Sequence, residues 1–483
     1  SNFVNDVMKY NNLGAGSIYD KPESSATQWS LMSYLARINY SLYDRYLFSV
    51  NGRVDGSSRF GGNNKYGFFP SGSVAWRISE EGFMEPVKAV INNLKLRTSY
   101  GFTGNTEIGV YESLATLGSN SWTIGNQLVS GFYPNRIPNP DLKWEKTGQF
   151  DIGFDLGLFN NRLRLTADYY YKKTTDLLYN VAIPSASGYD SMLKNIGSVQ
   201  NKGYELSIES DNLSGAFSWT TAFNISFNRN KVLELGGETY KDVGTYDDHL
   251  KTSDIRRLIV GQPIGVFYGY RFDGIFQNEA ECAQQTSSPS PIGVGLRRYK
   301  DLNGDGKIDA TNDREILGDA NPKFFGGMTN TFAYKGFELN VFLQYSYGNK
   351  IFNYNAMELE SPTGGQNVYQ DLVNRWTPTN PSNEYQKATT NRNNIVSDRF
   401  IEDGSFLKLK TVSLSYSFPK LNWKHIGGLR LYVTGQNLLT WTKYRGYDPE
   451  VSYRGASTLE AGEDFGGYPQ ARTFMFGIKL DIK

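Results

Sequence analysis

The sharpest chemical motif in this 483-residue sequence is an acidic, glycine-containing stretch, Asp301-Leu-Asn-Gly-Asp-Gly-Lys-Ile-Asp309. Its oxygen-bearing side chains have the spacing of the first ligands in an EF-hand calcium loop, and Gly306 stands where that loop turns sharply. The backbone carbonyl of the seventh residue is a further ligand in such loops. The spacing therefore predicts a structural calcium site formed by Asp301, Asn303, Asp305, Lys307, Asp309 and Asp313.

The end of this motif departs from the EF-hand pattern. Asn312 stands where an EF-hand has its bidentate Glu, so that ligand is absent or shifted to Asp313 or Glu315. No amphipathic helix flanks the loop. The alternative is a turn rich in Asp and Asn that is held by its own side chains. Both interpretations stay open at this point.

Other residue types that support catalysis are scarce. His249 and His425 are the only histidines and lie far apart in the sequence, which argues against a zinc site and against a Ser-His-Asp triad. The single cysteine, Cys282, excludes an internal disulfide framework. The glycine-rich stretches lack the lysine and helix of a phosphate-binding loop. We predict no enzymatic activity and no organic cofactor.

The elements that carry these residues are expected to be long β-strands. Apolar side chains alternate with polar ones through Phe150–Leu158, Leu163–Tyr171, Tyr204–Ile208, Phe217–Phe227, Phe337–Tyr345 and Phe474–Ile482. Runs of about ten residues match strands that cross a bilayer at a tilt, whereas soluble strands average about five or six residues. We expect the apolar sides to touch lipid and the charged sides to border water. Asp151, Asp155, Glu205 and Glu209 are then solvated wall residues and not a glycosidase pair.

The connections between these strands alternate in length. Short turns are expected near 43–45, 159–161, 211–215, 335–336 and 419–427, with a medium one at 79–90. Long loops are expected near 104–142, 229–323, 350–403 and 441–470, with others near 57–67 and 174–199. Outer-membrane barrels have short periplasmic turns and long extracellular loops. Thirteen recognisable strands, and a less clear one before residue 27, predict about fourteen strands and a periplasmic C-terminus.

Composition agrees with this all-β prediction. Aromatic residues make up 14% of the chain, and a net charge of +1 argues against a nucleic-acid partner. A mean hydropathy of −0.48 is too low for a helical membrane protein. Tryptophans at strand ends suggest interfacial girdles: Trp76, Trp144, Trp219, Trp423 and Trp441. Trp122 and Trp376 lie in loops, where stacking on a substrate is the alternative to loop packing.

Seven stretches in a fixed order resemble the SusC/RagA family of TonB-dependent outer-membrane transporters. They are Gly67-Phe-Phe-Pro-Ser-Gly-Ser-Val-Ala-Trp-Arg77 with Glu80-Glu-Gly-Phe83, Leu94-Lys-Leu-Arg-Thr-Ser-Tyr-Gly-Phe-Thr-Gly-Asn105, Asn139-Pro-Asp-Leu-Lys-Trp-Glu145, Asn195-Ile-Gly-Ser-Val-Gln-Asn-Lys-Gly-Tyr-Glu205, the Asp301–Asp309 motif, Gly435-Gln-Asn-Leu-Leu-Thr-Trp-Thr442 and Tyr468-Pro-Gln-Ala-Arg-Thr473. Each motif alone is weak evidence for the family, but the seven occur in the family's order and together span residues 67–473.

The resemblance implies a transmembrane antiparallel barrel of twenty-two strands that is filled by an N-terminal plug domain. It also implies energy from the TonB complex and a SusD-like surface lipoprotein as a lid. Because plug and TonB-binding segment are not found in this sequence, we expect it to be the C-terminal part of one such barrel. The plug and the rest of the barrel would then be partners, as would outer-membrane lipid and a glycan, oligosaccharide or peptide substrate.

Two alternatives fit part of the pattern. A passive outer-membrane channel of about fourteen strands fits the strand count but not the family motifs. A secreted all-β adhesin or carbohydrate-binding protein fits the aromatic residues and the calcium motif, but it would have shorter strands and would dissolve in water. Detergent dependence separates the adhesin from both barrels.

Overall fold

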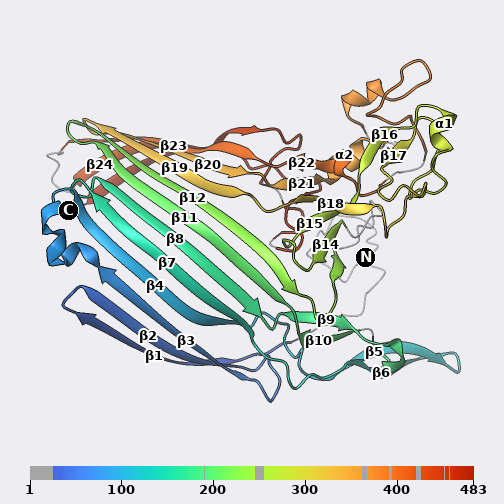
Figure 1. Cartoon of the computed structure of the whole chain (residues 1–483), viewed down its shortest axis with the longest axis horizontal. Helices are drawn as coiled ribbons and strands as arrows, with labels where there is room; N and C mark the ends of the chain where they lie inside the picture. The colour runs from blue at the N-terminus through green and yellow to red at the C-terminus, as the bar shows by residue number, and fades with distance from the viewer. Residues whose placement is uncertain are drawn as a thin grey trace, which may run out of the picture.

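The fold is all-β, and one large antiparallel sheet dominates it (Figure 1). The computed structural model describes residues 26–189, 191–244, 255–361, 367–390, 394–419, 426–450, 452–455 and 457–482. His249, His425, Trp423 and the strand expected before residue 27 lie outside these ranges, as does most of the turn expected at 419–427. Within them, thirteen strands form the sheet, in agreement with the thirteen recognised in the sequence.

The sheet follows the order of the chain, so each strand pairs with its nearest long neighbour in the sequence. Its strands are β1 (Leu31–Leu42), β2 (Tyr46–Ser57), β3 (Tyr66–Arg77), β4 (Ile91–Asn105), β7 (Glu145–Leu158), β8 (Leu163–Thr175), β11 (Ser198–Leu213), β12 (Phe217–Glu234), β19 (Phe324–Tyr334), β20 (Phe337–Tyr347), β23 (Phe406–Ser417), β24 (Ile426–Thr442) and β26 (Thr473–Ile482). The first and last strands are its two edges.

Strand register keeps the alternation of the sequence on two continuous faces. Phe154 of β7 stands opposite Leu96 of β4 and Ala167 of β8, while the next residue, Asp155, stands opposite Lys95 and Thr166. Because side chains alternate along a strand, this register puts apolar residues on one face and charged residues on the other.

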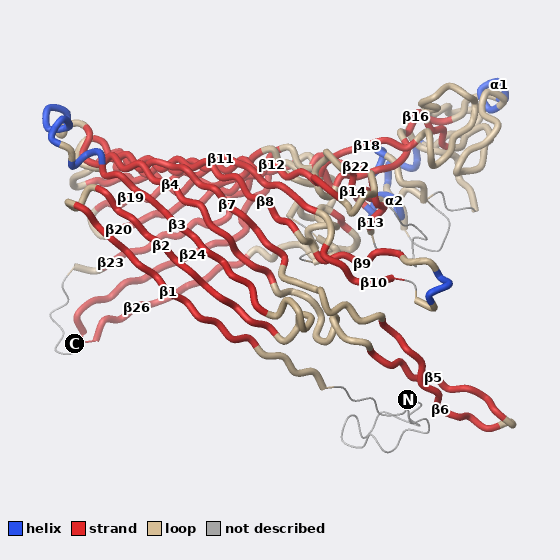
Figure 2. The backbone as a smooth tube through the Cα atoms, turned by 60° about the horizontal axis from the view of Figure 1, so that its bottom comes forward, coloured by secondary structure: helices blue, strands red, loops and turns tan. Residues whose placement is uncertain are grey.

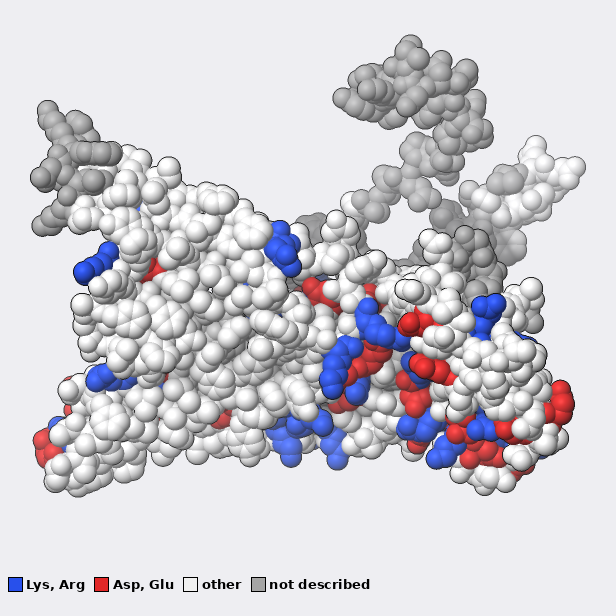
Figure 3. Space-filling view, turned by 90° about the horizontal axis from the view of Figure 1, so that it is seen from above, with Lys and Arg blue, Asp and Glu red and all other residues white. Residues whose placement is uncertain are grey.

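The large sheet is curved into a trough (Figure 2). We assign the polar face to the inner side of the trough, because the hollows on the sheet lie on that face. Two hollows on the sheet are lined mainly by polar-face residues, among them Arg53, Asp55, Lys95 and Asp151. In the view of Figure 3, few charged side chains lie on the visible strand surface between the two ends of the molecule, and charges gather at the loop end.

Tight turns close one end of the sheet. Tyr43 and Asp44 both have positive φ angles, as do Asn160 and Asn161. The strand pairing leaves three residues in the turn between Leu42 and Tyr46, four between Leu158 and Leu163, and two between Tyr334 and Phe337. Asn and Asp tolerate the left-handed conformation that such short turns use. The turns expected at 43–45, 159–161 and 335–336 are confirmed.

The medium connection at 79–90 forms two 3₁₀ segments, η3 (Ile78–Glu80) and η4 (Gly82–Val87). The Glu81 carboxylate accepts hydrogen bonds from Tyr46 Oη at 2.6 Å, Trp76 Nε1 at 3.0 Å and Arg45 Nη1 at 3.1 Å. One carboxylate thus fastens this connection to the β1–β2 hairpin.

The long connections at the other end contain strands of their own, which the sequence analysis did not predict. They are β5 (Thr116–Ile124), β6 (Gln127–Arg136), β9 (Leu178–Ala182), β10 (Ser191–Asn195), β13 (Tyr240–Val243), β14 (Arg256–Ile259), β15 (Val266–Tyr270), β16 (Phe272–Ile275), β17 (Arg297–Tyr299), β18 (Arg314–Asp319), β21 (Lys350–Asn353), β22 (Ile401–Asp403) and β25 (Glu463–Asp464). Short helical segments accompany them: η5 (Ser185–Ser187), α1 (Glu279–Cys282), α2 (Tyr354–Leu359), η6 (Gln370–Asn374) and η7 (Asp398–Phe400).

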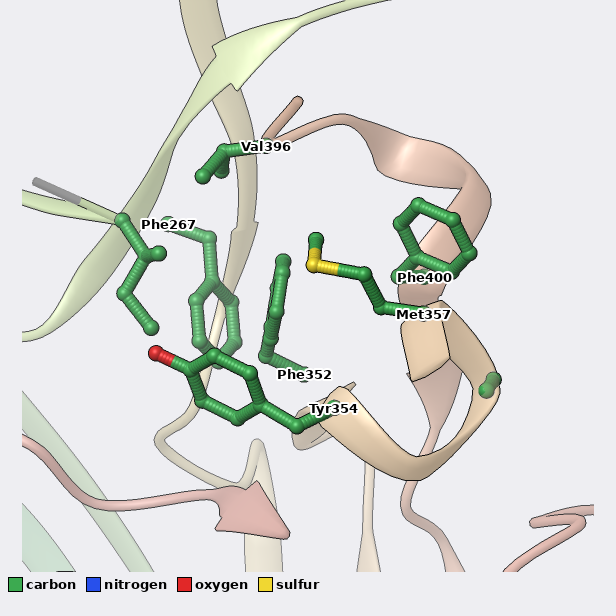
Figure 4. Packing of buried hydrophobic residues seen from close by; sticks show 8 residues of the cluster. Phe267, Phe352, Tyr354, Met357, Val396 and Phe400 are labelled. Atoms are coloured by element: carbon green, nitrogen blue, oxygen red, sulfur yellow. The ribbon is translucent and has the colours of Figure 1, made fainter. Parts of the chain in front are cut away.

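Three of these connections pack together into one unit, which we call the loop cap: the described residues of 235–323, 348–405 and 443–472. Its core joins Phe267 of β15, Phe352 of β21 and Phe400 of η7, all fully buried (Figure 4). Phe465 from the third connection packs against the same cluster. Burying a side chain of this size stabilises a fold by about 1.5–3 kcal/mol, so the core holds the three connections together.

A second buried cluster lies where β3 and β7 begin. Trp144 is 7% exposed, packs against Phe60 and Phe69, and donates from Nε1 to the Lys65 carbonyl at 3.1 Å. The girdle position expected for Trp144 is therefore wrong: this residue packs in the interior beside the loops. Among the described residues no helix is long and apolar enough to cross a membrane.

Candidate functional site

The polar face of the trough carries charged side chains that pair across strands. Arg97 Nη2 lies 2.7 Å from the Asp168 carboxylate, and Lys95 Nζ lies 3.2 Å from that of Asp155. Arg164 and Glu209 pair at 2.9 Å and are both about half exposed. These side chains alternate in charge around a solvated wall, as the sequence predicted for Asp155 and Glu209. No pair of carboxylates is left poised for acid–base chemistry in this group.

The connection after β24 folds back onto this polar face. Lys408 of β23 pairs with Asp448 at 2.6 Å and with Glu450 at 2.5 Å, and Lys410 pairs with Glu450 at 3.0 Å. Gln344 of β20 donates to the other oxygen of Glu450 at 2.8 Å. We call these five residues the latch. They tie the loop that follows β24 to the inside of the trough.

A bulge in β23 lies at the latch. The pairing of β23 with β24 shifts between Leu409 and Thr411, which leaves Lys410 outside the regular ladder. In a regular strand, Lys408 and Lys410 would point to one face and Leu409 to the other. The extra residue of the bulge changes the direction of the side chains beyond it. Burial alone would raise the pKa of Glu450, but hydrogen bonds from the two lysines lower it below its ordinary value.

The loop cap contains a second set of buried charges. Glu360 is 1% exposed and contacts Arg399 Nε at 2.7 Å and Arg445 Nη1 at 3.3 Å, while Arg445 also pairs with Glu402 at 2.8 Å. Glu360, Arg399 and Glu402 belong to the connection before β23, and Arg445 joins them from the connection after β24. Removing one partner would leave a buried charge without compensation, so the network fixes how the connections sit together.

A further ionic contact joins β14 to β25. Arg256 and Glu463 are both essentially buried and pair at 2.9 Å. Burial raises the pKa of Glu463, although Arg256 acts in the opposite direction. Nearby, Tyr444 donates to Asp464 at 2.5 Å, and burial and this carboxylate raise the pKa of Tyr444.

The predicted calcium motif is a compact loop in which the carboxylates accept bonds from the loop's own amides. Asp301 accepts from the amides of Gly304 and Gly306, both at 2.7 Å. The fully buried Asp313 accepts from the amides of Leu302 and Asp309, both at 2.8 Å, and so joins the two ends of the loop.

The remaining predicted ligands lie in the same loop. Asn303 and Asp305 bond to each other, the Lys307 amide donates to Asp305, and backbone amides of Asn312 and Thr311 lower the pKa of Asp309. Within the described residues, no group of three or more His, Cys, Asp or Glu side chains is placed to hold a metal ion. The structure brings the six residues together in one loop, and calcium binding stays a prediction.

The two loop tryptophans differ in their surroundings. Trp376 donates from Nε1 to Gln277 at 3.1 Å and packs beside Gly295 within the loop cap. Trp122 is 57% exposed on the β5–β6 hairpin, which projects from the loop end (Figures 1 and 2). Loop packing therefore describes Trp376, whereas Trp122 is available to a partner.

The fold and the polar trough define the barrel of a TonB-dependent receptor, and comparison with known proteins agrees. The chain belongs to the family described as TonB dependent receptor-like, beta-barrel, whose model matches residues 2–277. It is 41% identical to TonB-dependent receptor P3 of Formosa agariphila over 487 residues, 99% of this chain and 48% of that protein. It is 32% identical to TonB-dependent receptor SusC of Bacteroides thetaiotaomicron over 472 residues, 95% of this chain and 44% of that protein.

Within that family the chain resembles SusC/RagA-like TonB-dependent transporters, as its motifs predicted. The structure of the RagAB peptide transporter superimposes with a TM-score of 0.82 at 28% identity, over 97% of this chain and 50% of that chain. The chain spans about half the length of the curated relatives it matches. These relatives are named receptors and transporters, not enzymes.

Sequence reasoning missed the latch and the buried charges of the loop cap. The β23 bulge leaves a weak signal, because two polar residues in a row, Lys410 and Thr411, shift the phase of the apolar alternation in that strand. The partners of these lysines lie forty or more residues away in the sequence, and nothing local marks them.

Proposed function

We propose that this chain is part of an outer-membrane importer for glycans, oligosaccharides or peptides, driven by the TonB complex and closed by a SusD-like surface lipoprotein. The observation that carries the proposal is the two-faced trough: an apolar outer face backs a charged, solvated inner face, and a folded loop cap stands at one end. A spanning barrel needs an apolar face toward lipid and a polar face toward its passage. The similarity to TonB-dependent receptor SusC and to the RagAB peptide transporter supports import that depends on TonB.

The β5–β6 hairpin supports the proposed lid as a partner. Leu117, Trp122, Ile124 and Phe132 on it are each more than half exposed. A group of exposed apolar side chains on a projecting hairpin is typical of a protein interaction surface. We infer that the lid lipoprotein covers this hairpin at the outer mouth of the barrel.

The direction of the strands gives the proposed orientation. β26 ends at the same side of the sheet as the tight turns, and the loop cap lies at the opposite side (Figure 1). With short turns in the periplasm, the C-terminus is periplasmic and the cap is extracellular. We further propose that the Asp301–Asp313 loop binds calcium as a structural ion of the extracellular cap.

Uptake by whole cells tests the import proposal. Cells that express the full-length protein with its lid should accumulate a labelled substrate, and they should lose uptake when TonB is deleted or the proton gradient is collapsed. A passive channel would keep uptake without TonB, and an adhesin would bind substrate without transporting it. A full-length protein that stays monodisperse in buffer without detergent would contradict the membrane assignment.

A further inference from the structure

The four-stranded sheet of the loop cap has one buried face and an opposite face on which several described side chains are partly exposed, which we call the open face. Leu258 and Phe267 point into the interior, at 7% and 0% exposure. The opposite face carries Tyr240 of β13, Arg257 of β14 and Tyr268 of β15. Residues of this open face line a hollow of about 560 Å³.

Aromatic rings and guanidinium groups alternate across the open face. Arg257 lies between two tyrosines, with its guanidinium carbon 4.0 Å from the ring centres of both Tyr240 and Tyr268. Arg314 of β18 continues the series at 5.1 Å from the Tyr268 ring. We call Tyr240, Arg257, Tyr268 and Arg314 the Tyr–Arg face. Each member comes from a different strand, so the sheet sets their spacing.

Hydrogen bonding holds the central arginine rigid. Arg257 donates from Nε and Nη2 to the two carboxylate oxygens of Asp242, at 2.6 and 2.9 Å. This bidentate pair fixes the plane of the guanidinium group, and the rings on both sides restrict its rotation. Its third nitrogen, Nη1, has no hydrogen bond to the described residues of the chain. A donor is therefore held in a fixed direction at the hollow.

The described lining of the hollow contains more arginines than carboxylates. Its lining contains Arg257 and Arg314 against one carboxylate, Asp242, with Thr239 and Thr311 as hydroxyl donors and acceptors. Arg257 is 11% exposed, so solvent screens it less than an ordinary surface arginine. Tyr240 is half exposed and offers a ring face to a ligand.

We propose that the Tyr–Arg face is a binding subsite for a negatively charged sugar, carrying a carboxylate or a sulfate, within the imported glycan. A sugar ring stacks on Tyr240 while its hydroxyls meet those of Thr239 and Thr311. The anionic group accepts hydrogen bonds from the fixed guanidinium of Arg257. This inference rests on the proposed importer and names the substrate class of the chain within it.

A peptide fits this face less well. Peptides that bind to sheets add a strand at an edge and place alternate side chains in pockets. The Tyr–Arg face is the broad side of the sheet, where rings and guanidinium groups stand in place of backbone donors and acceptors. A sugar ring, which presents a face of C–H groups with equatorial hydroxyls around it, suits such a surface. A peptide ligand is an outcome that the experiment can detect.

The test measures binding to the full-length importer with its lid in detergent. The probes are tetragalacturonate, its carboxyl-reduced neutral form, a sulfated galactose tetrasaccharide and an acidic tetrapeptide. We expect at least one acidic saccharide to bind more tightly than the neutral one, with an affinity that falls as salt rises. Tyr240→Ala should weaken that binding about tenfold and Tyr240→Phe should largely retain it. Tyr447→Ala, which removes another exposed loop tyrosine, is the matched control.

A second variant tests the charge without leaving a carboxylate unpaired. Arg257→Gln with Asp242→Asn removes both partners, so it should abolish the preference for acidic over neutral saccharide. No binding of either acidic saccharide, a preference for the neutral form, binding of the peptide alone, or equal loss in the Tyr447 control would overturn the proposal. If the protein then still takes up a neutral glycan or a peptide in a TonB-dependent way, the proposed importer function is retained and only the acidic-sugar subsite is refuted.

Discussion

Removal of the Lys408 charge should release the loop that follows β24 from the inner face of the trough. The Lys408 side chain is 3% exposed and Asp448 is 8% exposed, so their contact lies away from water. Breaking a buried ion pair by removing one partner costs about 3–5 kcal/mol, because the other charge stays buried. In Lys408→Met we expect the low end of this range, since Glu450 keeps Lys410 and Gln344.

A loss of about 3 kcal/mol raises the population of the released loop about 100-fold. Hydrogen–deuterium exchange of the full-length protein measures this directly, in peptides that cover residues 443–450. Lys408→Met should speed exchange there by roughly this factor and leave the sheet strands unchanged. Lys408→Met with Asp448→Asn should recover part of the protection, because the unpaired carboxylate is removed as well.

Lys443→Met provides the control, since Lys443 is exposed in the same loop and outside the latch. Exchange that changes less than threefold in Lys408→Met, or equally in both variants, would refute the latch.

The stability that Glu450 gives to the latch should depend on pH, and the sign of this dependence is definite. Because the pKa of Glu450 is lowered in the fold, its contribution is present above the ordinary carboxyl range of about 4.3 and is lost as pH falls through the lowered value.

Three further predictions concern the loop end. Calcium should raise the thermal stability of the full-length protein, and Asp301→Asn should abolish this effect; an identical melting temperature with calcium and with chelator would contradict the calcium proposal. Trp122→Ser with Phe132→Ser should weaken binding of the lid lipoprotein about tenfold or more in a pull-down titration and leave strand protection unaltered, whereas unchanged affinity would exclude this hairpin from the interface. The cap should lose stability as pH rises above about 10, the ordinary pKa of tyrosine, because the raised pKa of Tyr444 keeps its proton in the fold; Tyr444→Phe should flatten that part of the melting profile.

The sequence alone was enough to predict the large sheet. An apolar–polar period of two is a local property, and a run of ten or more residues leaves few alternatives to a long strand. The positive φ of Asn160 and Asn161 also follows from residue type, which is why the turn between β7 and β8 could be placed. Seven local motifs in order added the family, which the comparisons confirmed.

Local patterns could not show how the long loops fold. Trp144 stands at a strand end like the other candidates for the girdle, yet Phe60 from a distant loop covers it. Apart from β5 and β6, the strands in the loops are two to six residues long, too short for a periodic signal to stand out from chance. Their structure depends on contacts with other loops, which no local window of the sequence contains.

Tertiary structure also decided where the charges act. The sequence established that the numbers of basic and acidic residues are nearly equal. The alternation along the strands also showed that the charged side chains lie on the face opposite the apolar side chains. Only the folded chain brings Lys408 to Asp448 and places Arg257 between Tyr240 and Tyr268. Ion pairs and stacked rings form between groups that are close in space, and residue type fixes which contacts are favourable without fixing which partners meet.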